Sequence, residues 1–577
     1  MAEIPDNAIS VNTPPGAPMF CLEARGPSFR EVAVCTAPAA LVVLAFLLPF
    51  LNSAFTIDDV TFLLEAKHIL GDPLHPAAFN MVTDGVRVRL SHTIVTGPVM
   101  AYLLVPSVLA GGKEWVAHVI EAALLVVGIC GTVALGLRLG LDRTQAAIAA
   151  LLLVASPAVM GMAGTAMPDV PAMAFGAVGI ERFFDWHQTR RWTSAMAAAL
   201  LLALATLCRP SLLIALAACW VVMEERSRSR TEPSRWSLTS LAALMIPLFL
   251  SLVIIAVALF VTRDPASGDT VAGAAFSRID SRLVTFNLVS FALHWVVAFP
   301  LALLWPLVRG QPFINARRSY LAYALAVVLF VVSGDVSLFV RNGNSALDFG
   351  GAFLVLILLG HSIDVIADII GDAWRTQDVT QLMLGAWLLI ALPAATYAHL
   401  PSKVLVPAAP AMAILLARRI QLPELGRLRR SVFATVTLCG LMLGLLIIRA
   451  SADLAEVGRE GGRIVAQQRR EHSTVWMDGA WGFQWYAMEA GAQPVAETPP
   501  FPEPGDVVVA GLRAKWIRKH WRNTTLLHQR IFAEHGGRVY GEYASFFSNT
   551  VTPWPWPWSW DEDELGRVEV WQIGPAP

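Results

Sequence analysis

Long apolar runs recur from about residue 32 to residue 450, and this recurrence constrains the fold more than any other feature of the sequence. The first run, Val32 to Leu51, has about the twenty residues that a helix needs to cross a bilayer core of about 30 Å. Hydrophobic residues make up 55% of the 577 positions and charged residues only 15%. Backbone polar groups inside a bilayer must be hydrogen-bonded within their own segment, which favours helices. The sequence therefore predicts an all-α polytopic membrane protein.

The charges between these runs predict the topology, because Lys and Arg accumulate in cytoplasmic loops. We assign to the cytoplasm the N-terminal segment 1–31 and the basic connections at 138–143, 182–191, 226–235, 309–318, 375 and 418–430. Alternation then gives about thirteen transmembrane helices within residues 32–450. This count requires that Ile94 to Leu109, interrupted by Pro98 and Pro106, lies against the membrane within a first external loop, 52–115.

Residues 451–577 have a different character and are expected to form a small external soluble α/β domain. Their apolar runs are short, aromatic residues are frequent, and Pro-Pro, Pro-Gly and Gly-Gly pairs mark turns. Residues 506–510 and 567–572 suggest strands, whereas the Pro-Trp run at 553–560 fits neither a helix nor a central strand. The aromatic segment 475–486 could stack on sugar faces, although aromatic residues in a small domain more often form its core.

Asp58 and Asp59 are adjacent carboxylates just after the first apolar run. One interpretation is that one of them caps a helix over Val60 to Leu70. The other is that Asp58 acts as a general base on an acceptor hydroxyl or amine while Asp59 supplies the cap. Asp169, between Pro168 and Pro171, begins another external helix and is open to the same two interpretations. Two acidic helix starts on one face of the membrane favour a catalytic site there.

Two segments carry a resemblance to a known family: Phe55 to Asp59 (Phe-Thr-Ile-Asp-Asp) and Met167 to Pro171 (Met-Pro-Asp-Val-Pro). They resemble the two acidic motifs of the GT-C glycosyltransferases. The most similar branch contains the protein O-mannosyltransferases and the lipid A aminoarabinose transferases (glycosyltransferase family 39-like). The resemblance implies an inverting transfer of sugar from a polyprenyl-phosphate donor. It also implies a bacterial inner membrane, with the active site facing the periplasm.

The same resemblance implies roles for single residues. Asp58 matches the catalytic acidic residue, Asp59 its frequent acidic neighbour, and Asp169 the second motif. The segment His399 to Pro407 is similar to the family's late motif, in which a basic residue and Tyr precede a Leu-rich helix. Lys403 takes the basic position, and Val404 stands where the family usually has Tyr.

A lipid-phosphate donor requires cations on the external face to hold its phosphate as a leaving group. Lys403 and Arg209 are the leading candidates, because each lies in a very short connection between apolar segments, where a charge without a role is costly. The further candidates are Arg278, Arg282 and Arg341, with Arg87, Arg89 and His92 in the first loop. Taken singly, each of these cations is more often an ordinary solvated or interfacial charge than a phosphate ligand.

The same residues leave open a metal site and two alternative functions. Asp58 and Asp169 could share a divalent Mg or Mn ion with the donor phosphate, but the sequence shows no tight ligand cluster, and we predict no metal site. A net charge of -1 gives no electrostatic case for nucleic acid. The alternatives are an oligosaccharyltransferase or polymer ligase that uses a lipid-pyrophosphate donor, and a transporter. A transporter usually shows repeated halves and charges near mid-membrane. The acceptor could be a lipid, a glycan or a protein.

Overall fold

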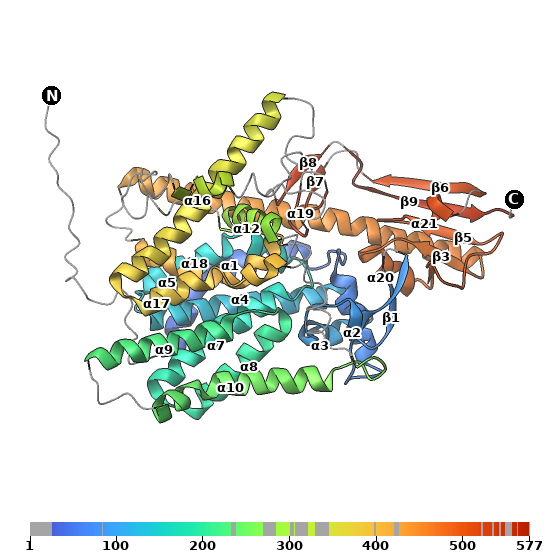
Figure 1. Cartoon of the computed structure of the whole chain (residues 1–577). Helices are drawn as coiled ribbons and strands as arrows, with labels where there is room; N and C mark the ends of the chain where they lie inside the picture. The colour runs from blue at the N-terminus through green and yellow to red at the C-terminus, as the bar shows by residue number, and fades with distance from the viewer. Residues whose placement is uncertain are drawn as a thin grey trace.

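The computed structural model of the chain shows a bundle of helices from which one long helix extends into a C-terminal β-sheet (Figure 1). It describes residues 26–83, 85–231, 238–268, 284–299, 305, 321–322, 324–328, 345–396, 400–420, 426–520, 523–532, 536–541, 544–548, 557–561 and 563–575.

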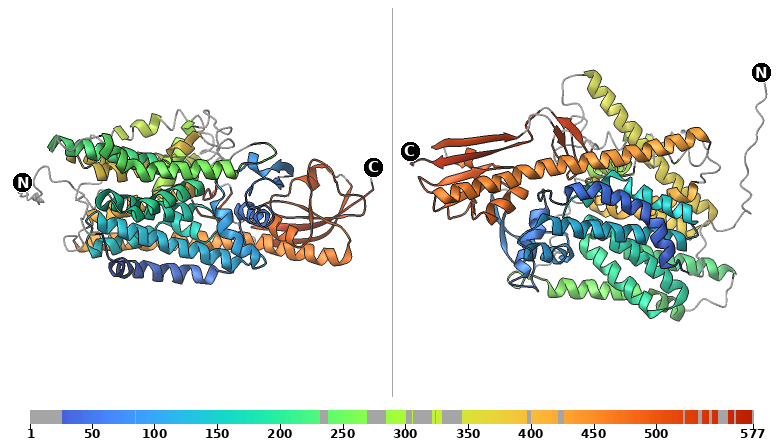
Figure 2. Two further views of the ribbon diagram at one scale, coloured as in Figure 1. Left: turned by 90° about the horizontal axis from the view of Figure 1, so that it is seen from below. Right: turned by 180° about the vertical axis from the view of Figure 1, so that it is seen from behind.

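The helices that precede the C-terminal sheet are arranged roughly side by side in Figures 1 and 2. In chain order, the elements of this part are α1 (Phe29–Leu47), η1 (Leu48–Phe50), α2 (Asp59–Ile69), β1 (Asn80–Thr83), β2 (Val86–Arg89), η2 (Leu90–His92), α3 (Val99–Leu109), α4 (Glu114–Arg138), α5 (Arg143–Val154), α6 (Pro157–Ala163), α7 (Asp169–Thr189), α8 (Trp192–Cys208), α9 (Leu213–Thr231), α10 (Leu238–Val261), α12 (Val284–Ala298), α16 (Ser345–Thr376), α17 (Val379–Trp387), η6 (Leu392–Thr396), η7 (Ser402–Ala408), α18 (Ala409–Arg419) and α19 (Arg427–Glu471).

Within the described residues, five helices are long and apolar enough to cross a membrane: Phe29–Phe50, Glu114–Arg138, Thr239–Val261, Val379–Thr396 and Arg430–Glu471. The pair α5 and α6, bent by 64°, would count as a sixth. These helices identify an integral membrane protein, while the expected thirteen crossings remain a prediction. Helix α3 has eleven residues and a length of about 16 Å, about half a bilayer core. The placement of Ile94 to Leu109 against the membrane stays a prediction.

Helices α4 and α7 run parallel in close contact, and glycines on α4 allow it. A Cβ added at Gly128 would lie 3.3 Å from the Cα of Ala174, and one added at Gly131 would lie 2.9 Å from the backbone nitrogen of Val178. Asp169, at the start of α7, lies about two turns before these contacts, and Glu121 lies about two turns before them on α4. The two residues are therefore at the same level along the parallel helices. The close contact therefore fixes the second acidic motif against the first third of a membrane-length helix.

The C-terminal part contains a five-stranded sheet of order β4-β3-β5-β9-β6. Strand β3 pairs in parallel with β4 and β5, and β9 pairs antiparallel with β5 and β6. Its elements are β3 (Val475–Asp478), α20 (Gly482–Glu489), β4 (Gln493–Pro494), β5 (Val507–Ala510), α21 (Trp516–His520), β6 (Thr524–Phe532) and β9 (Gly566–Ile573), with a separate pair, β7 (Gly536–Arg538) and β8 (Ser559–Asp561). The strands expected at 506–510 and 567–572 are confirmed as β5 and β9. Of the Pro-Trp run, residues 553–556 lie outside the described residues, and its end enters β8.

Helix α19 continues through the expected domain boundary between residues 450 and 451, so the change in composition there lies within one helix and not at a linker. Figure 2 shows this helix leaving the bundle and running along the C-terminal sheet. Its glycines form the contact with α20, because a Cβ added at Gly458 would lie 2.6 Å from the backbone nitrogen of Phe483. One added at Gly462 would lie 2.5 Å from the Cβ of Tyr486. The C-terminal part is thereby attached to the bundle through a close helix contact.

The first loop lies at the end of the bundle that faces the C-terminal sheet, where Figure 1 shows α2, α3 and β1 beside α20. The β1–β2 hairpin is joined to the end of α10 by an ion pair between Arg89 and Asp264, and Ser91 also donates a hydrogen bond to that carboxylate. Gln484 of α20 donates a hydrogen bond to the carbonyl of Val82 at 2.8 Å. The loop is thus held from both the bundle and the sheet.

Candidate active site

The first acidic motif turns directly into α2. Asp58 occupies the N-cap position of that helix, but its side chain makes no capping hydrogen bond. The interpretation of Asp58 as a helix cap is therefore wrong. Half of its side chain is exposed, and its Oδ2 accepts a hydrogen bond from Lys403 Nζ at 2.7 Å. The preceding residue, Ile57, has a φ of 26°, a conformation that is rare for a β-branched residue and common in constrained sites.

Asp59 is fully buried and joins the two acidic motifs. Its Oδ2 accepts the backbone N–H of Thr56 at 2.8 Å, and its Oδ1 accepts that of Ala166 at 3.0 Å. Both donors lie outside α2, so the expected capping role is wrong for Asp59 as well. Burial raises the pKa of Asp59 to about 7, although the two N–H donors oppose this effect. Asp59 is therefore a structural link between the motifs and a group that titrates near neutral pH.

The second acidic motif forms a buried ion pair. Asp169 is the first residue of α7, is fully buried and makes no capping bond. Instead its two oxygens accept hydrogen bonds from Arg209, from Nε at 2.7 Å and from Nη2 at 3.0 Å. Arg209 terminates α8, and 19% of its side chain is exposed. This two-point contact fixes the plane of the guanidinium, so Asp169 serves to orient Arg209.

Lys403 lies in η7 with only 5% of its side chain exposed, yet its ammonium reaches the half-exposed Asp58. The ring of Phe547, from the C-terminal part, lies 5.8 Å from the same ammonium. An aromatic face stabilises a cation that has left bulk water. Val404, where the family's late motif usually has Tyr, is half-buried beside it.

A polar stripe on α12 holds the segment that carries Lys403. Three side chains at positions i, i+3 and i+7 face this segment: Asn287 donates to the carbonyl of Ala395, Ser290 to that of Leu400, and His294 Nδ1 lies 2.8 Å from the hydroxyl of Ser402. This spacing lies along one face of a helix. Since Ser402 directly precedes Lys403, the stripe helps to fix where the lysine emerges.

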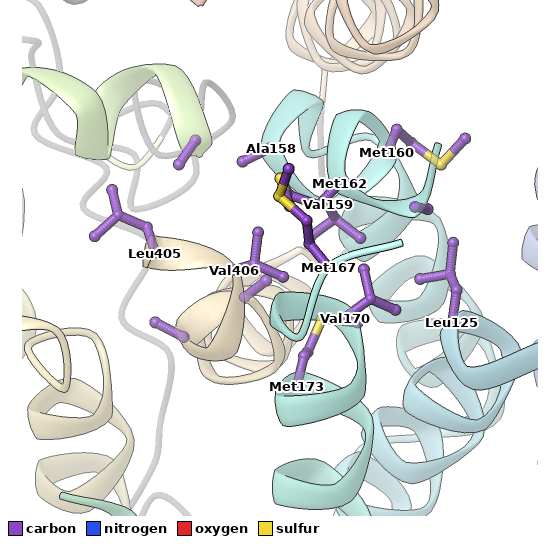
Figure 3. Close-up of a cluster of buried hydrophobic side chains, with 14 of the residues drawn as sticks. Leu125, Ala158, Val159, Met160, Met162, Met167, Val170, Met173, Leu405 and Val406 are labelled. Carbon is purple, nitrogen blue, oxygen red and sulfur yellow. The ribbon is translucent and has the colours of Figure 1, made fainter. Parts of the chain in front are cut away.

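Apolar packing positions the same segments. Figure 3 shows side chains from α4, α6, α7 and η7 meeting in one cluster, with Met162, Met167 and Val406 near its centre. Met167 and Val406 are almost completely buried. Because Met167 begins the second acidic motif and Val406 follows Lys403 in the late motif, this cluster joins the two motif segments behind their polar groups.

The C-terminal part supports the first motif through α20. Tyr486 accepts a hydrogen bond from the backbone N–H of Phe55 at 2.9 Å and donates one to Glu114 at 2.9 Å. A Cβ added at Gly482 would lie 2.0 Å from the carbonyl oxygen of Phe55, so only glycine fits this approach. Trp485 is buried against Phe55 with ring centroids 6.1 Å apart. These aromatic residues of segment 475–486 therefore form core and support the motif.

The structure brings Asp58 together with Lys403, and Asp169 together with Arg209. Asp59, in the first motif, is joined to the start of the second motif by its hydrogen bond from Ala166. Arg278, Arg282 and Arg341, together with His399, lie outside the described residues. Arg89 is paired with Asp264 and so serves to hold the first loop. Arg87 is exposed on β2.

Sequence reasoning missed Glu121. It lies in the apolar helix α4, is fully buried, and neither carboxylate oxygen has a hydrogen-bond partner. The charges of Asp59 and Asp169 act on it. An acidic residue within a membrane-length apolar run is itself a signal of function, and that signal was available in the sequence.

Asp58 and Asp169, the two carboxylates that could share a divalent metal, each have a cationic partner. Both oxygens of Asp169 accept hydrogen bonds from Arg209, and Asp58 is paired with Lys403. Among the residues that the structure describes, no group of three or more His, Cys, Asp and Glu side chains could hold a metal ion.

Known proteins were compared with the chain by sequence and by structure. No protein-family model matches the chain, and no curated protein matches it by sequence. Two solved structures of ArnT from Cupriavidus metallidurans are similar to it. The structure in the apo state is 16% identical, with 94% of this chain and 99% of that chain covered and a TM-score of 0.46. The structure bound to undecaprenyl phosphate is 15% identical, with 84% and 94% covered and a TM-score of 0.42.

The protein O-mannosyltransferase Pmt1-Pmt2 complex of S. cerevisiae, bound to the sugar donor, is also similar. It is 14% identical, with 46% of this chain and 40% of that chain covered and a TM-score of 0.31.

Proposed function

We propose that the chain is an inverting glycosyltransferase that moves a sugar from a polyprenyl-phosphate donor to an acceptor at the external face of the membrane. The observation that carries this proposal is the pair of Asp58 and Lys403, 2.7 Å apart. A half-exposed carboxylate can reach an acceptor, and the adjacent, largely enclosed ammonium can hold a phosphate. One contact therefore unites a candidate base with a candidate leaving-group cation.

The pair implies an order of events. A carboxylate that is bonded to an ammonium is a weaker base, so Lys403 must release Asp58 when it turns to the donor phosphate. The long, flexible stem of lysine permits this movement. Asp58 then takes the proton of the acceptor hydroxyl or amine, whose oxygen or nitrogen attacks the anomeric carbon as the bond to the phosphate oxygen breaks. Attack on the face opposite to the phosphate inverts the anomeric centre.

Arg209 supplies the second cation for the departing phosphate, and Asp169 holds its guanidinium in a fixed plane. Asp59 keeps the two motif segments at a constant distance through its bonds to Thr56 and Ala166. Groups that are fixed before the reaction stabilise developing charge at the lowest cost. Asp59 and Asp169 are thus supporting carboxylates, and Asp58 is the base.

The proposed setting is a bacterial inner membrane, with residues 1–31 in the cytoplasm, a GT-C type transmembrane domain of about thirteen helices over residues 32–450, and residues 451–577 in the periplasm. One observation supports placing the first loop and residues 451–577 on the same side. The first loop contacts the C-terminal part through Gln484 and Tyr486. Two segments in direct contact lie on the same side of a membrane.

Transfer of labelled sugar tests the proposal. Membranes containing the wild type, Asp58→Asn or Asp72→Asn at matched expression are supplied in separate reactions with polyprenyl-phosphate sugars and with lipid-pyrophosphate oligosaccharides. Asp72 is the control, because its side chain is 40% exposed in the same loop and bonds to His75. We expect transfer from the monophosphate donor in the wild type and the control, and its loss in Asp58→Asn. Transfer from the pyrophosphate donor alone would assign the chain to the oligosaccharyltransferases or polymer ligases, and normal transfer by Asp58→Asn would refute the base.

A further inference from the structure

Glu121 has surroundings that an ionised carboxylate does not tolerate. It is fully buried at the level of the second motif, and both of its oxygens lack hydrogen-bond partners. Placing a carboxylate in such a site without a partner costs far more than protonating it.

The charges around Glu121 also disfavour its ionised form. Four carboxyl groups gather at the site, Asp58, Asp59, Glu121 and Asp169, and the described residues bring two cations to them, Lys403 with Asp58 and Arg209 with Asp169. Asp59 is bonded to two backbone N–H groups, which leaves Glu121 as the carboxyl group with no compensating donor.

The groups that act electrostatically on Glu121 come from two of the elements around it. They are Asp59 of α2 and Asp169 of α7, and Glu121 in turn acts on Cys208 of α8, next to Arg209. His118 lies one turn earlier on α4 and bonds to the carbonyls of Phe50 and Leu51. Helices α1, α3, α5, α6 and α18 also contact α4, and none of their described residues is among the charges that act on Glu121.

We infer that Glu121 carries a proton at neutral pH and is a positioning residue for the donor. A neutral Glu121 adds no negative charge to the site in which Arg209 and Lys403 hold the donor phosphate. This inference rests on the proposed donor, whose phosphate is anionic. A second buried negative charge would repel that phosphate through a medium of low dielectric, with an effect on affinity of about tenfold. The proton on Glu121 thereby keeps the site receptive to an anionic ligand.

Two measurements on purified protein test the inference, and neither needs turnover. The first is the infrared difference spectrum of the wild type minus Glu121→Gln at pH 7, which shows the carboxylic-acid band of Glu121. Glu121→Ala is a second variant if Gln prevents folding. The second is the affinity for undecaprenyl phosphate from pH 6 to 10, measured by its stabilisation of the protein against heat.

Glu65 is the matched control for both. It is a buried glutamate of α2 whose pKa is raised to about 8 by burial, and no charged group contributes to that shift. Glu65→Gln should remove an acid band at pH 7, as a positive control for the spectra. It should leave the affinity for undecaprenyl phosphate unchanged at every pH.

We expect the acid band of Glu121 to be present and the affinity of Glu121→Gln at pH 7 to lie within about twofold of the wild type. At alkaline pH the wild type should lose up to about tenfold more affinity than the variant. Absence of the band, a large loss of affinity in Glu121→Gln at pH 7, or equal alkaline losses in both proteins would each overturn the inference. If no polyprenyl-phosphate sugar is transferred, the proposed function fails, yet the spectra still decide whether Glu121 is protonated.

Discussion

Lys403 Nζ lies 2.7 Å from Asp58 Oδ2, although 345 residues separate them in the chain. The lysine side chain is almost enclosed, whereas half of the aspartate side chain is exposed. An ammonium this close to a carboxylate forms an ion pair with it, and an anionic ligand can compete for the same ammonium. In the proposed mechanism, Lys403 is the counter-ion of Asp58 in the resting state and turns to the phosphate when the donor binds.

Replacing Lys403 with Met keeps most of its packing and removes the charge. We expect kcat/KM for the donor to fall by about 10²- to 10³-fold, with a raised donor KM, because one preorganised electrostatic contact to the leaving group is lost. Lys67→Met, which breaks an exposed pair with Glu489, should stay near wild-type activity. An unchanged donor KM in the Lys403 variant would exclude a phosphate-binding role. Steady-state kinetics with varied donor measure both.

Arg209→Lys should impair the enzyme despite keeping the charge. Lysine cannot reproduce the two-point contact with Asp169, so the cation loses its fixed orientation. Asp169→Ala should be worse for folding, because it leaves Arg209 partly buried without that carboxylate, with a loss of about 3–5 kcal/mol. Thermal unfolding in detergent and transfer kinetics separate the two effects. Equal stability of Asp169→Ala and the wild type would contradict the structural importance of the pair.

Tyr486→Phe tests whether the C-terminal part supports the first motif. The substitution removes the hydroxyl that joins the N–H of Phe55 to Glu114, at a cost of about 1–3 kcal/mol for the unsatisfied partners. We expect lower kcat in a protein that still folds. Tyr540→Phe removes a hydroxyl that bonds to Arg513 in the same C-terminal part, and it should have little effect on kcat. Loss of activity in both variants would point to a general effect on folding.

The stability of the protein should decrease as pH rises from about 4.5 to about 8. Burial raises the pKa of Glu65 to about 8, so between these values the folded protein binds a proton that the unfolded chain has already released. The folded state is then favoured at the acidic end and loses this advantage as pH passes through 8. Asp59, with its pKa raised to about 7, contributes in the same direction. Unfolding midpoints of the wild type and Glu65→Gln should therefore differ in slope, and parallel slopes would contradict the burial of Glu65.

Removal of divalent cations should leave transfer intact. Asp58 and Asp169 already have cationic partners in Lys403 and Arg209, so an ion would have to displace both. The measurement is transfer of labelled sugar after treatment with EDTA, compared with the same membranes after Mg²⁺ or Mn²⁺ is added back. Loss on treatment and recovery with the metal would show that a metal takes part.

The local features of this chain were readable from its sequence. Runs such as Val32 to Leu51 predict membrane helices, because length and hydropathy are properties of a segment by itself. The segments 506–510 and 567–572 predicted β5 and β9 for the same reason. Arg209 and Lys403 were selected because a charge in a short connection between apolar runs is costly unless it has a role. Asp58, Asp59 and Asp169 were selected as acidic helix starts whose motifs resemble those of a known family.

The partners of those charges were decided by the tertiary structure alone. Nothing in the sequence pairs Asp58 with Lys403 or Asp169 with Arg209, because these contacts join segments that approach only when α7, α8 and η7 pack together. The pKa of Asp59 near 7 depends on burial, which no local pattern specifies. Glu121 shows the division most clearly: its place in an apolar helix is visible in the sequence, whereas its position near Asp59 and Asp169 follows from the close contact of α4 with α7.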